Sequence, residues 1–376
     1  MRVVITGGGT GGHVYPGLAI AEALRRRHPD AAIVFIGGDR LQAQVVPQEG
    51  WPYRRVRARP LARGRGVAAV GALAATGAGA AQALAVLARL WPDVVVATGG
   101  YVSVPVGLAA VVLGRPLVLQ EQNMRPGLAN RLLARWARWV SVAHPAAGAR
   151  LGARRVEVTG VPIRRRALEG ERARGLARWG LVPERLTLLV LGGSQGAESL
   201  NRAACRLADL LPADGGVQLL HQTGAAHLSW VREAIDRRRH LGPGAVRHVA
   251  VPYLDPIGDA YACADMVLCR AGAATLAEVT AWGLPAVLVP YPHAAEAHQE
   301  DNAAVLVAAG AAVRVADAAL ADGTVLEVVR PLIADHARRE AMARASRLLG
   351  RPDAAEVVAD LVARTAGRAV AREAPA

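Results

Sequence analysis

The stretch Val3-Val-Ile-Thr-Gly-Gly-Gly-Thr-Gly-Gly-His13 gives the clearest indication of the fold. It joins a short β-branched apolar run directly to a glycine-rich loop, and an amphipathic helix is predicted after it, around Leu18–Arg27. The same order returns at Leu186–Leu191, an apolar run that leads into the loop Gly192–Gly196. A strand, a glycine loop and a helix in this order are typical of βαβ units that build a parallel sheet.

Short apolar runs alternate with helical stretches along most of the chain. Further strands are predicted at Ile33–Ile36, Val94–Ala97, Leu117–Leu119, Trp139–Val142, Val156–Val158, Val217–His221, Val246–Val249, Met266–Cys269, Ala286–Val289 and Ala312–Val315. The alternation breaks at Gly160-Val-Pro162, and a length of 376 residues favours two domains. We therefore predict an α/β fold of two Rossmann-like parallel-sheet domains with a ligand cleft between them. They are expected at residues 1–160 and 161–351, with a C-terminal helix, about 352–368, packed back on the first domain.

Composition excludes several classes of protein. Hydrophobic residues make up 52% of the chain and charged residues 20%, which excludes disorder over most of the length. The three cysteines, Cys205, Cys263 and Cys269, lack the spacing of a disulfide scaffold or a structural zinc site. The first residues form no apolar run of the length of a signal peptide, so we expect a protein of the cytoplasm.

The positive charge is concentrated in the first part of the chain. Residues 1–160 hold 20 Arg against 7 Asp and Glu, a net charge of +13, whereas the whole chain carries +14. This asymmetry favours an anionic partner, either nucleic acid or a membrane surface, although a solvated arginine-rich face would look the same. Aromatic residues are only 4% and no nucleic-acid-binding motif appears, so we expect no nucleic acid.

A membrane surface fits the local sequence better. Basic residues lie beside Trp51 and Tyr53 and directly before the apolar segment Val67–Ala88, and they are Arg54, Arg55, Arg57, Arg59, Arg63 and Arg65. A second patch of this kind is Arg131, Arg135, Trp136, Arg138 and Trp139. Basic residues that flank an apolar helix are typical of a helix lying on anionic lipid, so Val67–Ala88 is interpreted as packed or interfacial.

The glycine loops predict phosphate binding. Gly7-x-Gly9-x-x-Gly12 matches the dinucleotide fingerprint, but the acidic residue expected about 20 positions later is poorly matched, because Asp39 comes later than that. A tight turn without a ligand remains an alternative. Similar loops occur at Thr98–Tyr101, Gly192–Gly196 and Arg270–Glu278. Glycines before a helix expose backbone amides to an anion. Four loops suit a nucleotide-diphospho-sugar in one domain and an anionic acceptor in the other.

Two further observations concern the donor. Glu278 lies one turn into a predicted helix, where its carboxylate can accept two hydrogen bonds from a ribose diol or remain an ordinary exposed carboxylate. No Asp-x-Asp occurs in the chain, so no metal is expected on the diphosphate. Helix dipoles and arginine are expected to stabilise the leaving group instead.

Taken in order, several motifs resemble those of one family. They are Thr6-Gly-Gly-Gly-Thr-Gly-Gly-His13 with Pro16, Thr98-Gly-Gly-Tyr-Val-Ser103 with Pro105, Glu121-Gln-Asn123 with Gly127 and Asn130, Gly192-Gly-Ser-Gln-Gly-Ala197, Arg270-Ala-Gly-Ala273 with Thr275 and Glu278, and His298-Gln299 with Asn302. The chain thus resembles glycosyltransferase family 28, the MurG family of bacteria. Gln120 departs from the family, which often has histidine there.

The resemblance implies a B-type glycosyltransferase fold and an inverting, metal-independent transfer without a cofactor. The implied reaction moves N-acetylglucosamine from UDP-N-acetylglucosamine to the 4-hydroxyl of undecaprenyl-pyrophosphoryl-MurNAc-pentapeptide, at the cytoplasmic face of the cell membrane. In the second domain Glu278 would hold the ribose, the backbone near Leu254 the uracil, and Gln299 the sugar. The implied substrate-binding residues are Thr10, Gly11, Gly12, Tyr101, Asn123, Arg164, Ser194, Leu254, Ala273, Ala274, Thr275, Leu276, Ala277, Glu278 and Gln299.

Inversion requires a general base for the acceptor hydroxyl. His13 is the first candidate because imidazole titrates near neutral pH, although it could instead hold the backbone or an acceptor phosphate. Glu121 is the second candidate and could instead brace its loop. Three other functions remain open from the sequence alone: a UDP-sugar epimerase of the same fold, an NAD-dependent dehydrogenase, and a nucleotide-sugar sensor without turnover.

Overall fold

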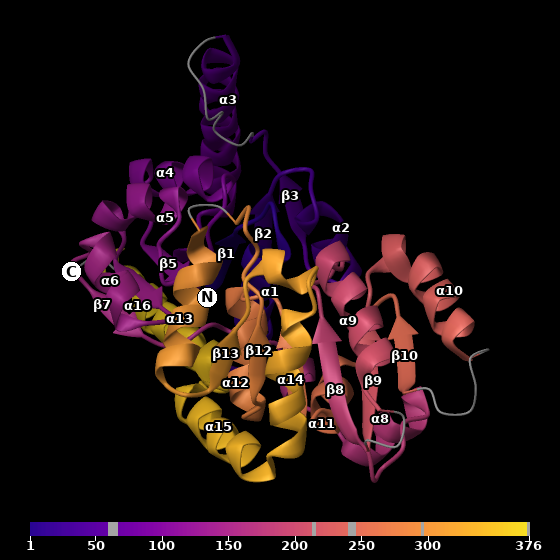
Figure 1. The fold of residues 1–376 in the computed structure, drawn as a ribbon. Helices are drawn as coiled ribbons and strands as arrows, with labels where there is room; N and C mark the ends of the chain where they lie inside the picture. Colours follow the sequence, from indigo (N-terminus) through magenta and orange to yellow (C-terminus); the bar gives the residue numbers. More distant parts are fainter. Residues whose placement is uncertain (59–66, 213–215, 240–245, 295–296, 374–376) are drawn as a thin grey trace. The chain divides into compact units, whose positions relative to one another are not determined.

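The computed structural model describes the backbone of residues 1–58, 67–212, 216–239, 246–294 and 297–373 (Figure 1), and the side chains of these residues except 67–76, 239 and 368–373. The chain forms two compact units. The first unit comprises Met1–Arg164 and Asp353–Ala376, and the second comprises Arg165–Pro352. Arg59, Arg63 and Arg65 of the predicted basic run lie outside the described residues.

The first unit is built on a seven-stranded parallel sheet of order β3-β2-β1-β4-β5-β6-β7 (Figure 1). Its strands are β1 (Arg2–Thr6), β2 (Ala32–Gly37), β3 (Tyr53–Arg55), β4 (Val94–Ala97), β5 (Leu117–Glu121), β6 (Trp139–Val142) and β7 (Val156–Val158). Its helices are α1 (Gly11–Arg27), α2 (Gln42–Gln48), α3 (Val67–Leu90), α4 (Ser103–Val112), α5 (Leu128–Leu133), α6 (Pro145–Leu151) and α16 (Ala354–Glu373).

Both faces of this sheet are covered. All four residues of β4 are buried, as expected for a central parallel strand between two helix layers. On one face α1 and α16 share a hydrophobic core, and the ion pairs Arg26–Glu356 and Arg27–Asp360 lie at its surface. On the other face α3 and α4 supply a second core. The C-terminal helix α16 therefore belongs to the first unit.

The second unit repeats the design with a six-stranded parallel sheet of order β10-β9-β8-β11-β12-β13. Its strands are β8 (Leu186–Leu191), β9 (Val217–Gln222), β10 (Arg247–Val251), β11 (Met266–Cys269), β12 (Ala286–Leu288) and β13 (Ala312–Arg314). Its helices are α7 (Arg165–Leu168), α8 (Arg172–Trp179), α9 (Glu198–Leu210), α10 (Leu228–Arg239), α11 (Ile257–Cys263), α12 (Ala273–Trp282), α13 (His298–Ala308), α14 (Thr324–Ala334) and α15 (His336–Leu349).

The predicted fold class is confirmed, because both sheets are parallel and both have helices on two sides. Every predicted strand is present, within one or two residues at its ends. The sequence missed β3, a three-residue edge strand with two arginines and little apolar character. Among the described residues, none of the helices combines the length and the apolar character needed to cross a bilayer.

Candidate functional site

The strand order locates the glycine loops within each unit. In a doubly wound sheet, ligands bind beyond the carboxyl ends of the strands, where the strand order reverses. In the first unit this point lies between β1 and β4, which lead into the loops Gly7–Thr10 and Thr98–Val102. In the second unit it lies between β8 and β11, which lead into Gly192–Ala197 and Arg270–Gly272. All four predicted loops therefore occupy switch points.

In the first unit the two loops pack tightly on each other. A Cβ added to Gly7 would lie 1.9 Å from Oγ1 of Thr98, and one on Gly100 would lie 2.1 Å from the carbonyl oxygen of Gly8. Gly100 also has a φ of +81°, which disfavours other residues. A Cβ on Gly9 would lie 3.2 Å from the ring of Tyr101. These glycines are required by loop-to-loop packing, independently of any ligand.

His13 lies at the first turn of α1, against the second loop. Its Nδ1 is 3.1 Å from Oγ1 of Thr10, and its backbone carbonyl accepts a hydrogen bond of 2.7 Å from the Thr98 hydroxyl. A Cβ on Gly99 would lie 2.8 Å from Cδ2 of the imidazole and 3.2 Å from Nε2. The ring is only partly buried. The packed loops thus fix the orientation of an accessible imidazole.

Glu121 ends β5 and holds the segment that follows it. Oε1 accepts hydrogen bonds from the backbone and side-chain nitrogens of Asn123, and Oε2 accepts from the Gly127 backbone and from Nδ2 of Asn130. The side chain is 1% exposed. Burial raises the pKa of this carboxyl, although the four hydrogen bonds act in the opposite direction. The geometry is that of a brace for the loop that carries Asn123.

Gln120 stands at the end of β5, next to Glu121. Its side chain is fully buried and donates a hydrogen bond of 3.1 Å to the carbonyl of Gly160. The hydroxyl of Ser141 donates to its Oε1. Gln120 therefore connects β5 with Ser141 on β6 and with Gly160, and it belongs to the framework of the sheet.

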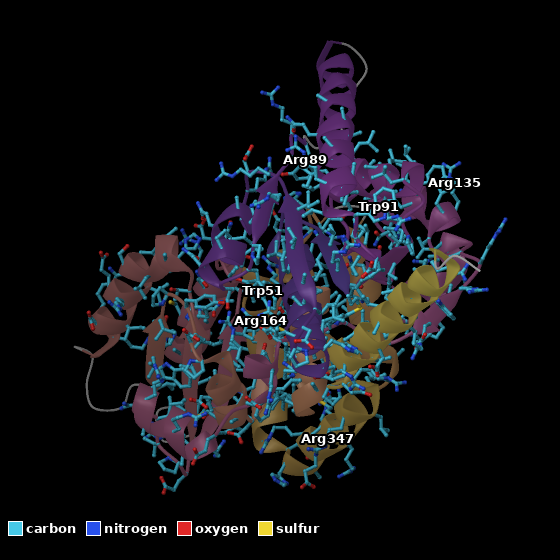
Figure 2. All side chains as sticks on the ribbon, turned by 180° about the vertical axis from the view of Figure 1, so that it is seen from behind. Trp51, Arg89, Trp91, Arg135, Arg164 and Arg347 are labelled. Atoms are coloured by element: carbon cyan, nitrogen blue, oxygen red, sulfur yellow. The ribbon has the colours of Figure 1, made fainter. Side chains whose placement is uncertain are left out.

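Arg164 (Figure 2) ends the segment Met1–Arg164 of the first unit and is 8% exposed. Its guanidinium forms ion pairs with Glu22 on α1 and with Glu49 directly after α2. Nη1 and Nη2 donate to Glu49 at 2.6 and 2.7 Å. In the structure this side chain is held by two carboxylates of the first unit, and the substrate-binding role that the resemblance implies for Arg164 stays a prediction.

The second unit differs because parts of its loops are open. Nothing lies within 4 Å of a Cβ built on Gly193, and Ser194 next to it is exposed. The loop is held from behind at two places. The side chain of Gln222 donates to the Gly193 carbonyl at 2.9 Å, and a Cβ on Gly196 would lie 1.8 Å from the carbonyl oxygen of Thr223. Ser194 is therefore presented on a supported turn.

The N-terminus of α12 is also open. Gly272 is the N-cap, without a side-chain cap, and the nearest atom to its added Cβ is 3.9 Å away. The first amides of a helix have no partner within it and favour an anion. Leu276 is the exception among the predicted amides, because its N–H donates to the Gly272 carbonyl at 2.9 Å. The amides of Ala273, Ala274 and Thr275 remain suited to a phosphate.

Glu278 follows one turn later on α12. The hydroxyl of Tyr261, from α11, donates to its Oε2 at 2.6 Å. Burial raises the pKa of the Glu278 carboxyl to about 7, and the Tyr261 hydrogen bond and the charge of Arg166 offset only part of the rise. Tyr261 is fully buried and was missed by the sequence analysis, because no motif or spacing links it to Glu278.

The remaining predicted residues have partners within the second unit. The backbone N–H of Leu254 donates to Oε1 of Gln222 at 3.1 Å. Oε1 of Gln299 accepts from the backbone N–H of Tyr291 at 2.9 Å. Gln222 was missed as well; the one available signal was the polar sequence Gln222-Thr-Gly224 at the end of a buried strand. Across the described ranges, no group of three His, Cys, Asp or Glu side chains is arranged to hold a metal.

Comparison with known proteins adds the family. The Glycosyltransferase family 28 N-terminal domain matches residues 3–142, and the Glycosyltransferase family 28 C-terminal domain matches residues 187–358. The chain belongs to glycosyltransferase family 28. The predicted resemblance is thereby confirmed.

Relatives in the family match over nearly the full length. One from Moorella thermoacetica is 44% identical over 97% of this chain and 99% of the relative, and one from Desulforudis audaxviator is 40% identical over 98% and 99%. Both are named UDP-N-acetylglucosamine--N-acetylmuramyl-(pentapeptide) pyrophosphoryl-undecaprenol N-acetylglucosamine transferase.

Solved structures show the same fold. The crystal structure of Acinetobacter baumannii MurG is 26% identical, with a TM-score of 0.75 over 96% of this chain and 99% of that one. A UDP-GlcNAc 2-epimerase from Neisseria meningitidis is only 15% identical, with a TM-score of 0.66 over 97% and 100%. At this identity, the similarity to the epimerase shows a shared fold and nothing about the reaction.

Proposed function

We propose that the protein transfers N-acetylglucosamine from UDP-N-acetylglucosamine to the 4-hydroxyl of undecaprenyl-pyrophosphoryl-MurNAc-pentapeptide. The observation that carries the proposal is the 40–44% identity, over nearly the whole chain, to relatives named for this transfer. The enzyme is a UDP-N-acetylglucosamine-dependent glycosyltransferase that works in peptidoglycan synthesis.

The donor binds in the second unit. The open turn with Ser194 and the first amides of α12 receive the diphosphate, whose charge the helix terminus stabilises. Glu278 accepts hydrogen bonds from the ribose hydroxyls, and Tyr261 holds its carboxylate in place. The backbone at Leu254 meets the uracil, and Gln299 lies beside the sugar.

The reaction is a single in-line displacement. The acceptor oxygen forms a bond to the anomeric carbon of the donor, the bond from that carbon to the diphosphate oxygen breaks, and UDP leaves with the electron pair. His13 takes the proton of the attacking hydroxyl as general base, from a ring that the first unit's loops hold in place. Glu121 is the weaker candidate, since its carboxylate already accepts four hydrogen bonds.

The first unit binds the lipid-linked acceptor and lies against the cytoplasmic face of the cell membrane as a peripheral protein. Exposed apolar and aromatic side chains lie near arginines on this unit. Trp91 is 40% exposed with the guanidinium of Arg115 stacked 4.4 Å from its ring, and Arg89 lies nearby at the end of α3 (Figure 2). Trp136 has Arg135 at 4.5 Å. Aromatic rings beside arginines suit an anionic lipid surface.

Release of UDP tests the proposed function. We expect UDP only when UDP-N-acetylglucosamine and the lipid-linked muramyl acceptor are both present. Conversion of the UDP-sugar without the acceptor would indicate an epimerase, and tight binding without any turnover would indicate a sensor. Sedimentation with anionic vesicles tests the membrane surface, with binding at low salt that weakens as salt is added.

A further inference from the structure

A network of buried polar side chains in the second unit, called the polar network below, lies outside all the motifs used above. It connects α9, β9, β10 and α10. The rings of His221 and His248 stack with their centroids 5.3 Å apart. The members are at most 7% exposed, and they are Asn201, His221, Arg238 and His248. A buried polar group without a hydrogen-bond partner lowers the stability of the folded state, so these four side chains are expected to hold one another in a fixed arrangement.

The donor and the acceptor of each hydrogen bond in the polar network can be assigned in turn, starting from Asn201. Nδ2 of Asn201 donates to the carbonyl oxygen of Thr223 at 2.9 Å, which leaves Oδ1 as an acceptor. His221 therefore donates through Nε2 at 2.9 Å, and its Nδ1 accepts from Nε2 of His248 at 3.1 Å. This assignment of tautomers follows from the network itself. It leaves Nδ1 of His248 as the acceptor that faces the guanidinium of Arg238.

Both imidazoles remain neutral in this arrangement. Burial lowers the pKa of His221 to about 3. Burial, together with the positive charges that His221 and Arg238 can carry, lowers the pKa of His248 well below its usual value. Arg238 is itself held by Asp209 and by the carbonyl of Cys205 at 2.8 Å. The order of donors and acceptors is therefore the same across the neutral pH range.

At one end the polar network reaches Thr223, in the turn that supports the loop Gly192–Ala197. Gly196 has a φ of +77°, and a Cβ on it would lie only 1.8 Å from the Thr223 carbonyl oxygen. A Cβ on Gly224 would lie 2.0 Å from the carbonyl oxygen of Gln195. The absence of a Cβ at both glycines therefore lets the backbones of the two turns lie directly against each other, and a movement of Thr223 would reach the residues that follow Ser194. The hydrogen bond from Asn201 fixes the Thr223 carbonyl against this loop.

We propose that Asn201 and His221 are positioning residues for the diphosphate of the donor, because they fix the Thr223 carbonyl on which the turn with Ser194 rests. His221 acts through Asn201, whose amide it orients. Neither residue touches the substrate. The inference rests on the proposed function of the second unit and adds to it the residues that determine how firmly the diphosphate is held.

The test compares ligands with and without the diphosphate. In Asn201→Ala and His221→Leu, we expect the dissociation constant of UDP and the KM for UDP-N-acetylglucosamine to rise about tenfold, the effect of one lost hydrogen bond. Turnover at saturating donor and the dissociation constant of uridine should stay within about twofold of the parent, because uridine has no diphosphate. In His221→Gln, the amide nitrogen can replace Nε2, so UDP binding should return to the parent level.

Val231→Ala is the matched control. This buried residue belongs to a small core with Cys205 and Ile235 and is not a member of the polar network. The substitution should therefore lower Tm and leave UDP binding unchanged. Unchanged UDP binding in Asn201→Ala would overturn the proposal, and so would an equal loss for UDP and uridine. Should His221→Leu not fold, Asn201→Ala and His221→Gln decide. Failure of the parent protein to bind UDP would instead contradict the proposed function.

Discussion

The glycine loops of the two units look alike in sequence and differ in their surroundings. In the first unit, Gly7, Gly8 and Gly100 are enclosed by neighbouring backbone and side chains. In the second unit, a Cβ on Gly193 or Gly272 would meet no atom closer than 3.9 Å. Glycine at these three positions of the first unit allows two loops to pack together, whereas Gly193 and Gly272 in the second unit have open space around them. The same residue type thus serves rigidity in one place and ligand access in the other.

This difference agrees with the proposed roles, in which the first unit supplies the general base and the second unit binds the donor. The packed loops hold the partly buried imidazole of His13 at one orientation. The open turn and the start of α12 can receive the diphosphate. Substitutions in the first unit should therefore change turnover or stability, and substitutions at the open positions of the second should change donor affinity.

His13→Ala should have the largest effect. Loss of a general base is expected to lower kcat by about 10²- to 10⁴-fold, while UDP binding stays at the parent level. His28→Ala, at the exposed opposite end of α1, is the matched control and should leave kcat unchanged. Steady-state kinetics with the lipid-linked acceptor measures both. Full activity of His13→Ala would remove His13 from the chemistry.

Glu278 should make donor binding depend on pH. Its pKa is raised to about 7 by burial, so the carboxylate that accepts from the ribose diol predominates only above that pH. Affinity for uridine, which carries no phosphate, should therefore rise as the pH increases from about 6 to about 8, by up to tenfold per unit below the pKa. Glu278→Gln should bind uridine more weakly and without this pH dependence. A parent profile that is flat over this range would contradict the ribose role.

Two glycine substitutions test the comparison directly. Gly272 has a φ of −71° and open space around it, so Gly272→Ala should change the free energy of unfolding by less than about 1 kcal/mol. It should still weaken UDP binding about tenfold, because the added methyl group obstructs the helix terminus. Gly100→Ala, with a φ of +81° and a clash at 2.1 Å, should destabilise the first unit by at least about 2 kcal/mol. Equal effects of both variants on stability would contradict the distinction.

Glu121→Gln should have the smallest effect on turnover. An amide group cannot accept the four hydrogen bonds that the carboxylate accepts, so stability should fall by about 1–3 kcal/mol. If Glu121 only braces its loop, kcat should fall less than about tenfold. Thermal unfolding and kinetics separate the two effects. A loss of kcat as large as that in His13→Ala, with stability unchanged, would make Glu121 the base.

The sequence predicted most of the fold because its strands are short apolar runs with strong β-branched character. It also predicted the four glycine-containing loops, since each follows such a run, but the strand order that places them at switch points came from the structure. It could not predict β3, whose residues Tyr53–Arg55 form a strand only because β2 offers an edge. The two sheets are thus readable from local pattern, apart from this edge strand.

Side-chain partners were less predictable, because they depend on residues far apart in the chain. The ion pairs of Arg164 involve Glu22 and Glu49, which are 142 and 115 positions away. The partner of Glu278 is Tyr261 on another helix. The presence of glycine after a strand also could not distinguish the packed loop from the open one, because the distinction depends on the neighbouring atoms in space.

Amide hydrogen exchange with and without UDP tests the central claim most directly. The account predicts protection on UDP binding at Gly192–Ala197 and at Gly272–Thr275, with no change at Gly7–Gly12. Protection confined to Gly7–Gly12, with none in the second unit, would contradict it.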